Sequence, residues 1–195
     1  MRRILNLIYL ISGWLAAGFI GAICLLVVCQ VCLNFIDRIS TILTGSAIGL
    51  TIPSYADFTG FFLAAASFLA LAYTLRRGGH IRVTLIISLL SPKLRHLFEI
   101  WCLLLASSVT IYFSWYTFSL TRESYIYNDL SSGMVAVPIW IPQTAVLLGL
   151  VILSIALIDE LICSLAGHTP SYVGAGEKLL DDGDGDKIHG QEQES

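Results

Sequence analysis

Residues 4–33 read ILNLIYLISGWLAAGFIGAICLLVVCQVCL, and this stretch decides the fold class of the protein. The run contains no Asp, Glu, Lys or Arg, and its few polar side chains are isolated among apolar and small ones. Bilayer hydrocarbon is about 30 Å thick, which about 20 apolar helical residues cross. Because the run is longer than that, the sequence predicts a membrane-spanning helix that tilts or begins along the membrane surface.

Three further runs are predominantly apolar, at residues 58–75, 97–120 and 135–163. A backbone amide in lipid has no water to bond, so runs of this kind form helices. Of the 195 residues, 56% are hydrophobic and 13% are charged, which is about half the charged share of a soluble domain. The composition excludes a disordered chain and argues strongly against a soluble domain. It predicts an all-α integral membrane fold, with a four-helix membrane domain over residues 1–166.

Positive charge is distributed unevenly among the segments outside these spans. Lys and Arg gather on the cytoplasmic side of membrane proteins. The N-terminus and the segment between the second and third spans carry seven of them, against two in the other connecting segments. We therefore expect both termini to be cytoplasmic, which agrees with an even number of spans. The seven are Arg2, Arg3, Arg76, Arg77, Arg82, Lys93 and Arg95, and the two are Arg38 and Arg122.

The remaining segments have distinct compositions. Residues 81–90 are mainly apolar and follow a basic stretch, so we expect an amphipathic helix in the membrane surface between the second and third spans. Residues 167–195 are rich in Gly and Asp and predict an acidic, disordered cytoplasmic tail. The first apolar run continues well past the length of a signal-peptide core, so we expect it to be retained as a span.

The centres of the four spans contain no ionisable side chain. Such a group in lipid usually marks an ion or substrate path, so the sequence predicts an accessory, non-catalytic subunit rather than a pump, channel or carrier. The four histidines lie outside the spans, and no Cys/His cluster has zinc spacing. We expect no cofactor or metal, and no surface for nucleic acid.

Small residues recur at four-residue spacing in the first two spans. Such faces let helix backbones approach closely in lipid, either within one chain or against a partner helix. Both possibilities stay open for this chain. The residues are Gly13, Ala17 and Gly21 in the first span, and Gly60 and Ala64 in the second.

Asp57 opens the second span, three residues after Ser54, which is the spacing of a capping box. Asp57 either caps the helix, where its charge is favoured, or contacts a partner.

Cys29 and Cys32 allow one enzymatic alternative. They form a C-x-x-C pair at the far end of the first span, where a quinone-linked, disulfide-forming membrane oxidoreductase places its thiols. Such an enzyme needs a second exposed thiol pair to pass oxidation on, and residues 121–137 contain no cysteine.

Three motifs carry a resemblance to a known family. Residues 76–85 read RRGGHIRVTL, residues 54–58 read SYADF, and residues 137–143 read VPIWIPQ. Together they closely resemble the small membrane subunit of tripartite ATP-independent periplasmic (TRAP) transporters, the DctQ-like family. That family usually has an acid where Thr84 stands here, so this chain lacks that carboxylate. The resemblance spans about residues 5–165.

The resemblance implies a subunit that braces a large, elevator-type, DctM-like membrane subunit and helps dock a DctP-like periplasmic substrate-binding protein. It implies a bacterial or archaeal inner membrane, and sodium-driven uptake of organic acids such as C4-dicarboxylates or sialic acid. Substrate and sodium would not bind this chain. Residues 34–57 and 121–137 would be the docking loops. We expect eight motif residues to face the partner or lipid: Asp57, Arg76, Arg77, Gly79, His80, Arg82, Pro138 and Trp140.

Overall fold

The computed structural model describes residues 2–76 and 92–166, and nearly all of them are helical. Four helices are long and apolar enough to cross a membrane. Among the described residues the extended structure is limited to one isolated bridge, between Leu130 and Pro138. The expected all-α membrane fold is therefore confirmed. The helices are α1 (Arg2–Thr44), α2 (Tyr55–Arg76), α4 (Pro92–Tyr127) and α5 (Trp140–Leu165).

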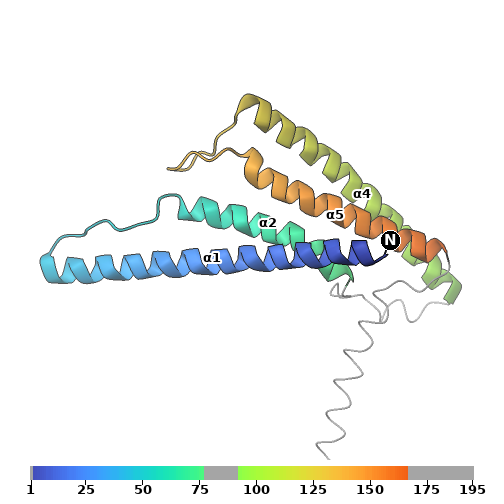
Figure 1. Ribbon diagram of the computed structural model, residues 1–195, viewed down its shortest axis with the longest axis horizontal. Coiled ribbons are helices and arrows are strands. Elements are labelled where there is room, and N and C mark those ends of the chain that lie inside the picture. Colours follow the sequence, from blue (N-terminus) through green and yellow to red (C-terminus); the bar gives the residue numbers. More distant parts are fainter. Residues whose placement is uncertain (1, 77–91, 167–195) are drawn as a thin grey trace, which may run out of the picture.

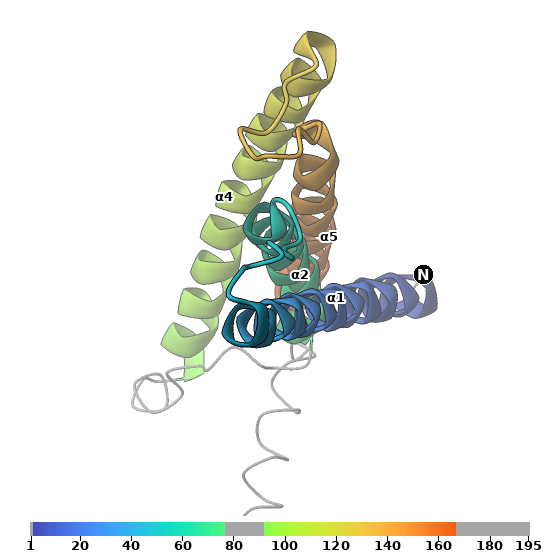
Figure 2. The ribbon, with the colours of Figure 1, turned by 90° about the vertical axis from the view of Figure 1, so that its left-hand side faces the viewer.

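The helices pack as two pairs that share a central contact. α1 packs on α2, α4 packs on α5, and α2 packs on α5. Figure 1 shows the two pairs converging near the N-terminus and splaying apart toward the other end. In Figure 2, α2 lies between α1 and the α4–α5 pair. We call the converging end the Arg76 end, and the opposite end, with connectors 45–54 and 128–139, the connector end.

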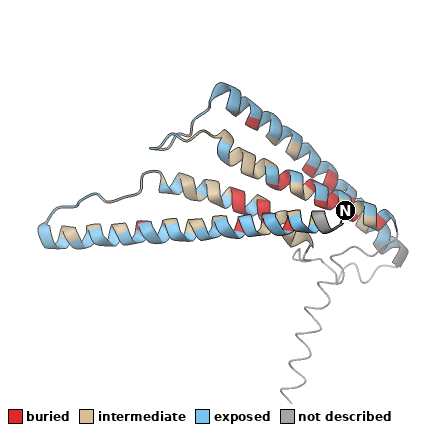
Figure 3. Ribbon diagram, in the orientation of Figure 1, coloured by how far each residue is buried: buried red, intermediate tan, exposed pale blue. Residues whose placement is uncertain are grey.

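The buried core is small and lies where the two pairs meet. Buried residues concentrate toward the Arg76 end of α2 and α5 (Figure 3). α2 contributes mostly alanines, with Ala72 fully buried beside Tyr9 of α1 and Ala156 of α5. Small side chains suit this place because helices in lipid associate through close packing rather than through removal of apolar surface from water.

Several helix boundaries differ from the expected spans. α1 continues eleven residues beyond residue 33, because residues 34–44 contain neither Gly nor Pro and keep a helical pattern. It ends at Gly45, whose φ of +71° is accessible to glycine and whose N–H donates to the Thr41 carbonyl at 3.1 Å. α4 likewise continues to Tyr127. Residues 34–44 and 121–127, expected to belong to loops, are therefore helical.

The start of the last span shifts in the opposite direction. The last span was expected to begin at residue 135, whereas α5 begins at Trp140. Pro138 therefore lies before the helix, in the bridge with Leu130. Pro142 stands in the first turn, where its missing N–H has no helical partner to lose.

Candidate functional site

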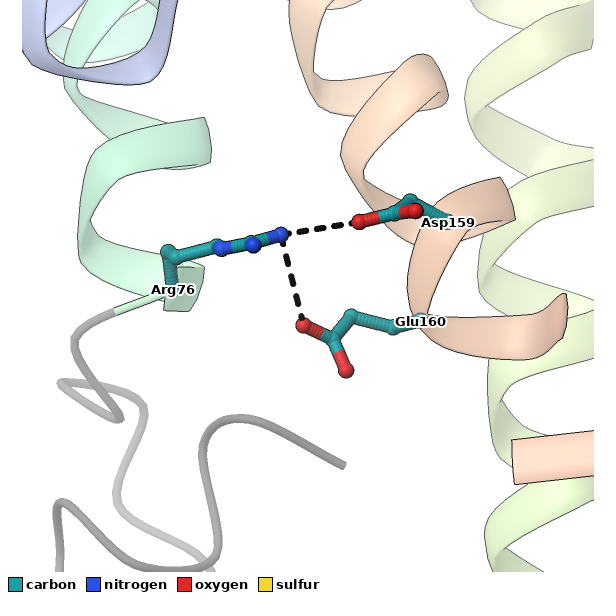
Figure 4. A network of polar contacts seen from close by, with 3 residues as sticks. All are labelled: Arg76, Asp159 and Glu160. Atoms are coloured by element: carbon teal, nitrogen blue, oxygen red, sulfur yellow. Dashed lines mark hydrogen bonds and ion pairs between the residues drawn. The ribbon is translucent and has the colours of Figure 1, made fainter. Parts of the chain in front are cut away.

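An ion-pair cluster joins three helices at the Arg76 end (Figure 4). Arg76, the last residue of α2, places Nη1 2.8 Å from Oδ2 of Asp159 and 3.9 Å from Oε1 of Glu160, both on α5. Its guanidinium carbon also lies 5.2 Å from the ring centroid of Tyr9 on α1. Glu160 is only 2% exposed. One cation therefore links α1, α2 and α5 at the point where the helix pairs converge.

The cluster gives Arg76 a role that the sequence analysis did not anticipate. Charges removed from water need a partner, and an arginine can bind two acceptors at once. α2 and α5 are separated by more than sixty residues in sequence, so residue spacing alone could not pair Arg76 with Asp159. The expected contact of Arg76 with a partner subunit or lipid stays a prediction.

A second polar cluster holds the first connector against α1. Gln30 is 5% exposed, and its side-chain amide both accepts and donates hydrogen bonds. Oε1 accepts from the N–H of Ile52 at 2.8 Å, while Nε2 donates to the side-chain oxygens of Thr51 and Asn34, each at 3.0 Å. A lone amide inside an apolar run is the signal that could have indicated this contact, because an unpaired amide in lipid is costly.

Asp37 fixes the same connector about two turns further along α1. Its Oδ1 accepts from the backbone N–H groups of Ile48 at 2.7 Å and of Gly49 at 2.8 Å. The φ of Gly49 is +77°, a value that suits glycine. Because Gln30, Asn34 and Asp37 recur at spacings of four and three residues, they share one face of α1. Connector 45–54 therefore folds back along that face.

The two connectors are bonded to each other. Oγ of Ser54 accepts from the N–H of Val135 at 2.9 Å. A Cβ on Gly133 would lie 2.8 Å from that Oγ and would overlap the carboxylate of Asp57. Gly133 thus lets connector 128–139 pass close to the start of α2, and a larger residue there would displace the Asp57 carboxylate.

The hydrogen bonds at the start of α2 differ from those of a capping box, in which the Ser54 hydroxyl would accept from the N–H of Asp57. The Ser54 hydroxyl is used across the connectors, and it is the Ser54 carbonyl that accepts from the N–H groups of Asp57 at 3.0 Å and Phe58 at 3.1 Å. Ser54 itself has a φ of 56°, so the chain turns sharply before α2.

Connector 128–139 is held in a narrow turn by its own backbone. The N–H of Ser131 donates to the Val137 carbonyl at 2.8 Å, and the N–H of Ile139 donates to the Asp129 carbonyl at 3.0 Å. Trp140 then packs edge-on against Tyr125 of α4, with ring centroids 5.5 Å apart. The motif around Pro138 and Trp140 thus closes the α4–α5 pair at the connector end.

The predicted small-residue faces divide into packed and open positions. A Cβ on Gly13 would lie 2.9 Å from Cγ of Tyr73, so this glycine lets α2 approach α1. A Cβ added to Gly21 or Gly60 would meet nothing within 4 Å, and Ala17 is exposed. The sequence analysis missed Gly149 of α5, whose Cβ would meet the Phe68 carbonyl carbon at 2.5 Å.

The structure offers little support for thiol chemistry. Cys29 and Cys32 are both exposed on α1 and are not joined by a disulfide. Neither connector, 45–54 or 128–139, contains a cysteine that could exchange with them. Over residues 2–76 and 92–166, no group of three or more His, Cys, Asp or Glu side chains is placed to hold a metal ion.

Several predicted features lie outside the described residues. They are Arg77, Gly79, His80 and Arg82 of the basic motif, the surface helix expected at 81–90, and the tail 167–195.

One comparison with known families matches most of the chain. A family model described as "Tripartite ATP-independent periplasmic transporters, DctQ component" matches residues 28–167, which is 140 of the 195 residues. The matched range contains both connectors, the α2–α5 ion pair and the VPIWIPQ motif. No curated protein and no solved structure matches the chain.

Proposed function

The chain belongs to the DctQ family of tripartite ATP-independent periplasmic transporter components, and on that premise we propose that it acts as the static, non-catalytic brace of the transporter. In this role it binds the large membrane subunit and holds it in place while that subunit moves the substrate. The chain contributes to sodium-driven uptake of organic acids, of the C4-dicarboxylate or sialic acid class, without binding substrate or sodium itself.

The observation that carries this proposal is the placement of charge along the helices. No Asp, Glu, Lys or Arg lies in α1 between Arg3 and Asp37, in α2 between Asp57 and Arg76, in α4 between Glu99 and Arg122, or in α5 before Asp159. A solute with a charge needs polar groups along its path through lipid. The polar side chains that the helices do carry bond mainly to their own backbone, as Thr110 and Ser154 do. The chain is therefore suited to support rather than to conduction.

The connector end supports the docking part of the proposal. Two connectors that are bonded to each other, and to α1, form a surface whose shape is fixed before a partner arrives. Preorganisation of this kind reduces the entropic cost of binding. Met134, at 86% exposure, is the most prominent apolar side chain on connector 128–139. With the predicted orientation, this surface faces the periplasm of a bacterial or archaeal inner membrane, where it meets the substrate-binding protein.

Reconstitution tests the proposal directly. The large subunit and the binding protein are placed in proteoliposomes with and without this chain, and sodium-driven uptake of the organic acid is measured. We expect uptake to depend on the chain. Uptake that proceeds equally well without it would contradict the brace.

The basic motif allows a second test of assembly. Arg82→Glu reverses one charge of the RRGGHIRVTL stretch. We expect weaker co-purification with the large subunit, or altered membrane orientation, with unchanged substrate binding by the soluble component. Normal assembly would assign Arg82 to a general role as a cytoplasmic anchor.

A further inference from the structure

Helix α1 is too long for the membrane that it crosses. From Leu5 to Thr44 the helix runs for 40 residues, which is about 60 Å at about 1.5 Å per residue. Spanning helices tilt by up to about 40°, and at that angle about 30 Å of hydrocarbon holds about 26 residues. About 14 residues must therefore leave the hydrocarbon. Tyr9 packs beside Arg76, so the excess lies at the connector end, where α1 continues beyond the start of α2 (Figure 1).

The excess coincides with a change in the sequence of α1. We call residues 34–44 the outer α1 segment. Its apolar side chains recur at helical spacing and occupy one face, while its polar side chains occupy the opposite face. The apolar residues are Phe35, Ile36, Ile39, Ile42 and Leu43, and the polar residues are Asn34, Asp37, Arg38, Ser40, Thr41 and Thr44.

Connector 45–54 covers part of the polar face, whereas Arg38 on that face is exposed. Asp37 binds the backbone of connector 45–54, as described above, and Thr44 Oγ1 lies 3.3 Å from the Ser46 carbonyl oxygen. The apolar face has no such cover within the described chain. Phe35 is 65% exposed, and Leu43 is 77% exposed.

The exposed apolar face is continuous with the lipid-facing surface of the span. Leu25, Val28 and Val31 precede it on the same side of α1, and they are 67%, 53% and 60% exposed. Within a membrane span, exposed apolar side chains of this kind face acyl chains. Since this exposed apolar face continues from Leu25 to Leu43, its outer part is also suited to contact with acyl chains. Water on that side would leave five large apolar side chains hydrated.

We propose that the outer α1 segment is a lipid-binding surface in the headgroup layer of the bilayer. Its apolar face rests on the acyl chains, and its polar face, with connector 45–54, faces the water. A tilt of about 40°, at the upper end of the usual range, reduces the height of about 60 Å of helix to about 46 Å, which is close to the roughly 40–45 Å of a bilayer with its headgroups. α1 then crosses the bilayer at a large tilt. Connectors 45–54 and 128–139 form the surface that is available to a soluble partner.

Spin labels at single cysteines test this placement in the full chain. The five native cysteines are replaced by alanine, and one nitroxide is attached after Ile39→Cys, Leu43→Cys or Arg38→Cys, in proteoliposomes with the large subunit. Val28→Cys serves as the lipid control and Ser46→Cys as the water control. We expect oxygen to reach the labels at 39 and 43 several-fold better than a water-soluble nickel complex does. The order should be reversed at 38.

Two results would overturn the proposal. If the labels at 39 and 43 match the water control, α1 projects out of the membrane. If both reagents are excluded there, a protein covers the face. Neither result bears on whether uptake needs the chain, so failure here is distinguishable from failure of the proposed function.

A measurement on the unaltered chain avoids dependence on the cysteine replacements. Lipids that carry a photoreactive diazirine in the upper acyl chain are crosslinked to the complex, and labelled peptides are mapped. We expect adducts on the outer α1 segment, on Phe35, Ile39 or Leu43. Adducts at residues 25–31 but none at 34–44 would contradict the proposal.

Discussion

Substitution of Gly149 by alanine tests the closest contact between α2 and α5. The added Cβ would lie 2.5 Å from the carbonyl carbon and 2.6 Å from the carbonyl oxygen of Phe68. Carbon atoms in ordinary contact are about 3.5–4.0 Å apart, so the two helices must separate by about 1 Å. Backbone atoms, unlike the end of a side chain, cannot rotate away, and the strain falls on the contact that unites the two helix pairs.

The expected cost follows from two opposing effects. Overpacking of this kind typically costs about 1–3 kcal/mol, while alanine in place of glycine within a helix returns about 0.5–1 kcal/mol. The two ranges leave a net loss of between about 0 and 2.5 kcal/mol, centred near 1 kcal/mol. For a chain of this size each kcal/mol shifts Tm by about 2–4 °C, so Tm should fall by about 2–4 °C.

Gly60→Ala on α2 is the matched control. Gly60 is exposed, and a Cβ there meets nothing within 4 Å, so the variant keeps the helix-propensity gain without the clash. The assay is thermal unfolding of the purified full chain in detergent, followed by circular dichroism and by recovery of the monodisperse peak. If Gly149→Ala is as stable as Gly60→Ala, the close crossing of α2 and α5 is wrong.

Three further predictions address the two polar clusters and the thiols. Asp159→Asn removes the carboxylate that lies 2.8 Å from Arg76, and because about a fifth of each side chain is exposed we expect the free energy of unfolding to fall by about 2–3 kcal/mol, below the usual 3–5 kcal/mol for a fully buried pair. Adding Arg76→Gln to that variant should lower the free energy of unfolding only a little further. Additive losses would argue against the ion pair. Gln30→Leu removes the hydrogen bonds to connector 45–54, so proteolysis within that connector should accelerate while the helix content stays the same. An unchanged cleavage rate would show that these hydrogen bonds do not hold the connector. Replacing Cys29 and Cys32 together by serine should leave uptake by the reconstituted transporter unchanged, and a loss of activity would revive the thiol-oxidase alternative.

The fold class could be predicted from the sequence because few backbone conformations satisfy their hydrogen bonds in lipid. Runs such as residues 4–33 have no means of satisfying their backbone in hydrocarbon except a helix. The prediction failed at the ends of the helices, where the spans were equated with the apolar runs. Residues 34–44 are polar on one face, yet nothing in them terminates a helix before Gly45. The length of an apolar run indicates what the membrane accepts, and helix-ending residues decide where the helix stops.

The candidate site was harder to predict because its contacts connect distant residues. Asp159 and Arg76 both lie at span ends, but their pairing depends on how α2 packs against α5. Gln30 interrupts an apolar run, and its partners on connector 45–54 lie more than twenty residues away. Gly149 follows Ala145 at four-residue spacing, but that spacing alone does not reveal the backbone approach that makes this glycine important.

Flux through liposomes that contain the purified chain alone tests the central claim most directly. A sodium gradient is imposed, and entry of radiolabelled sodium and of a C4-dicarboxylate or sialic acid is followed against empty liposomes. We expect no flux above the empty control, because the helices offer no charged or metal-binding group between their two polar ends. Transport of either solute by the chain alone would contradict its assignment as a passive brace.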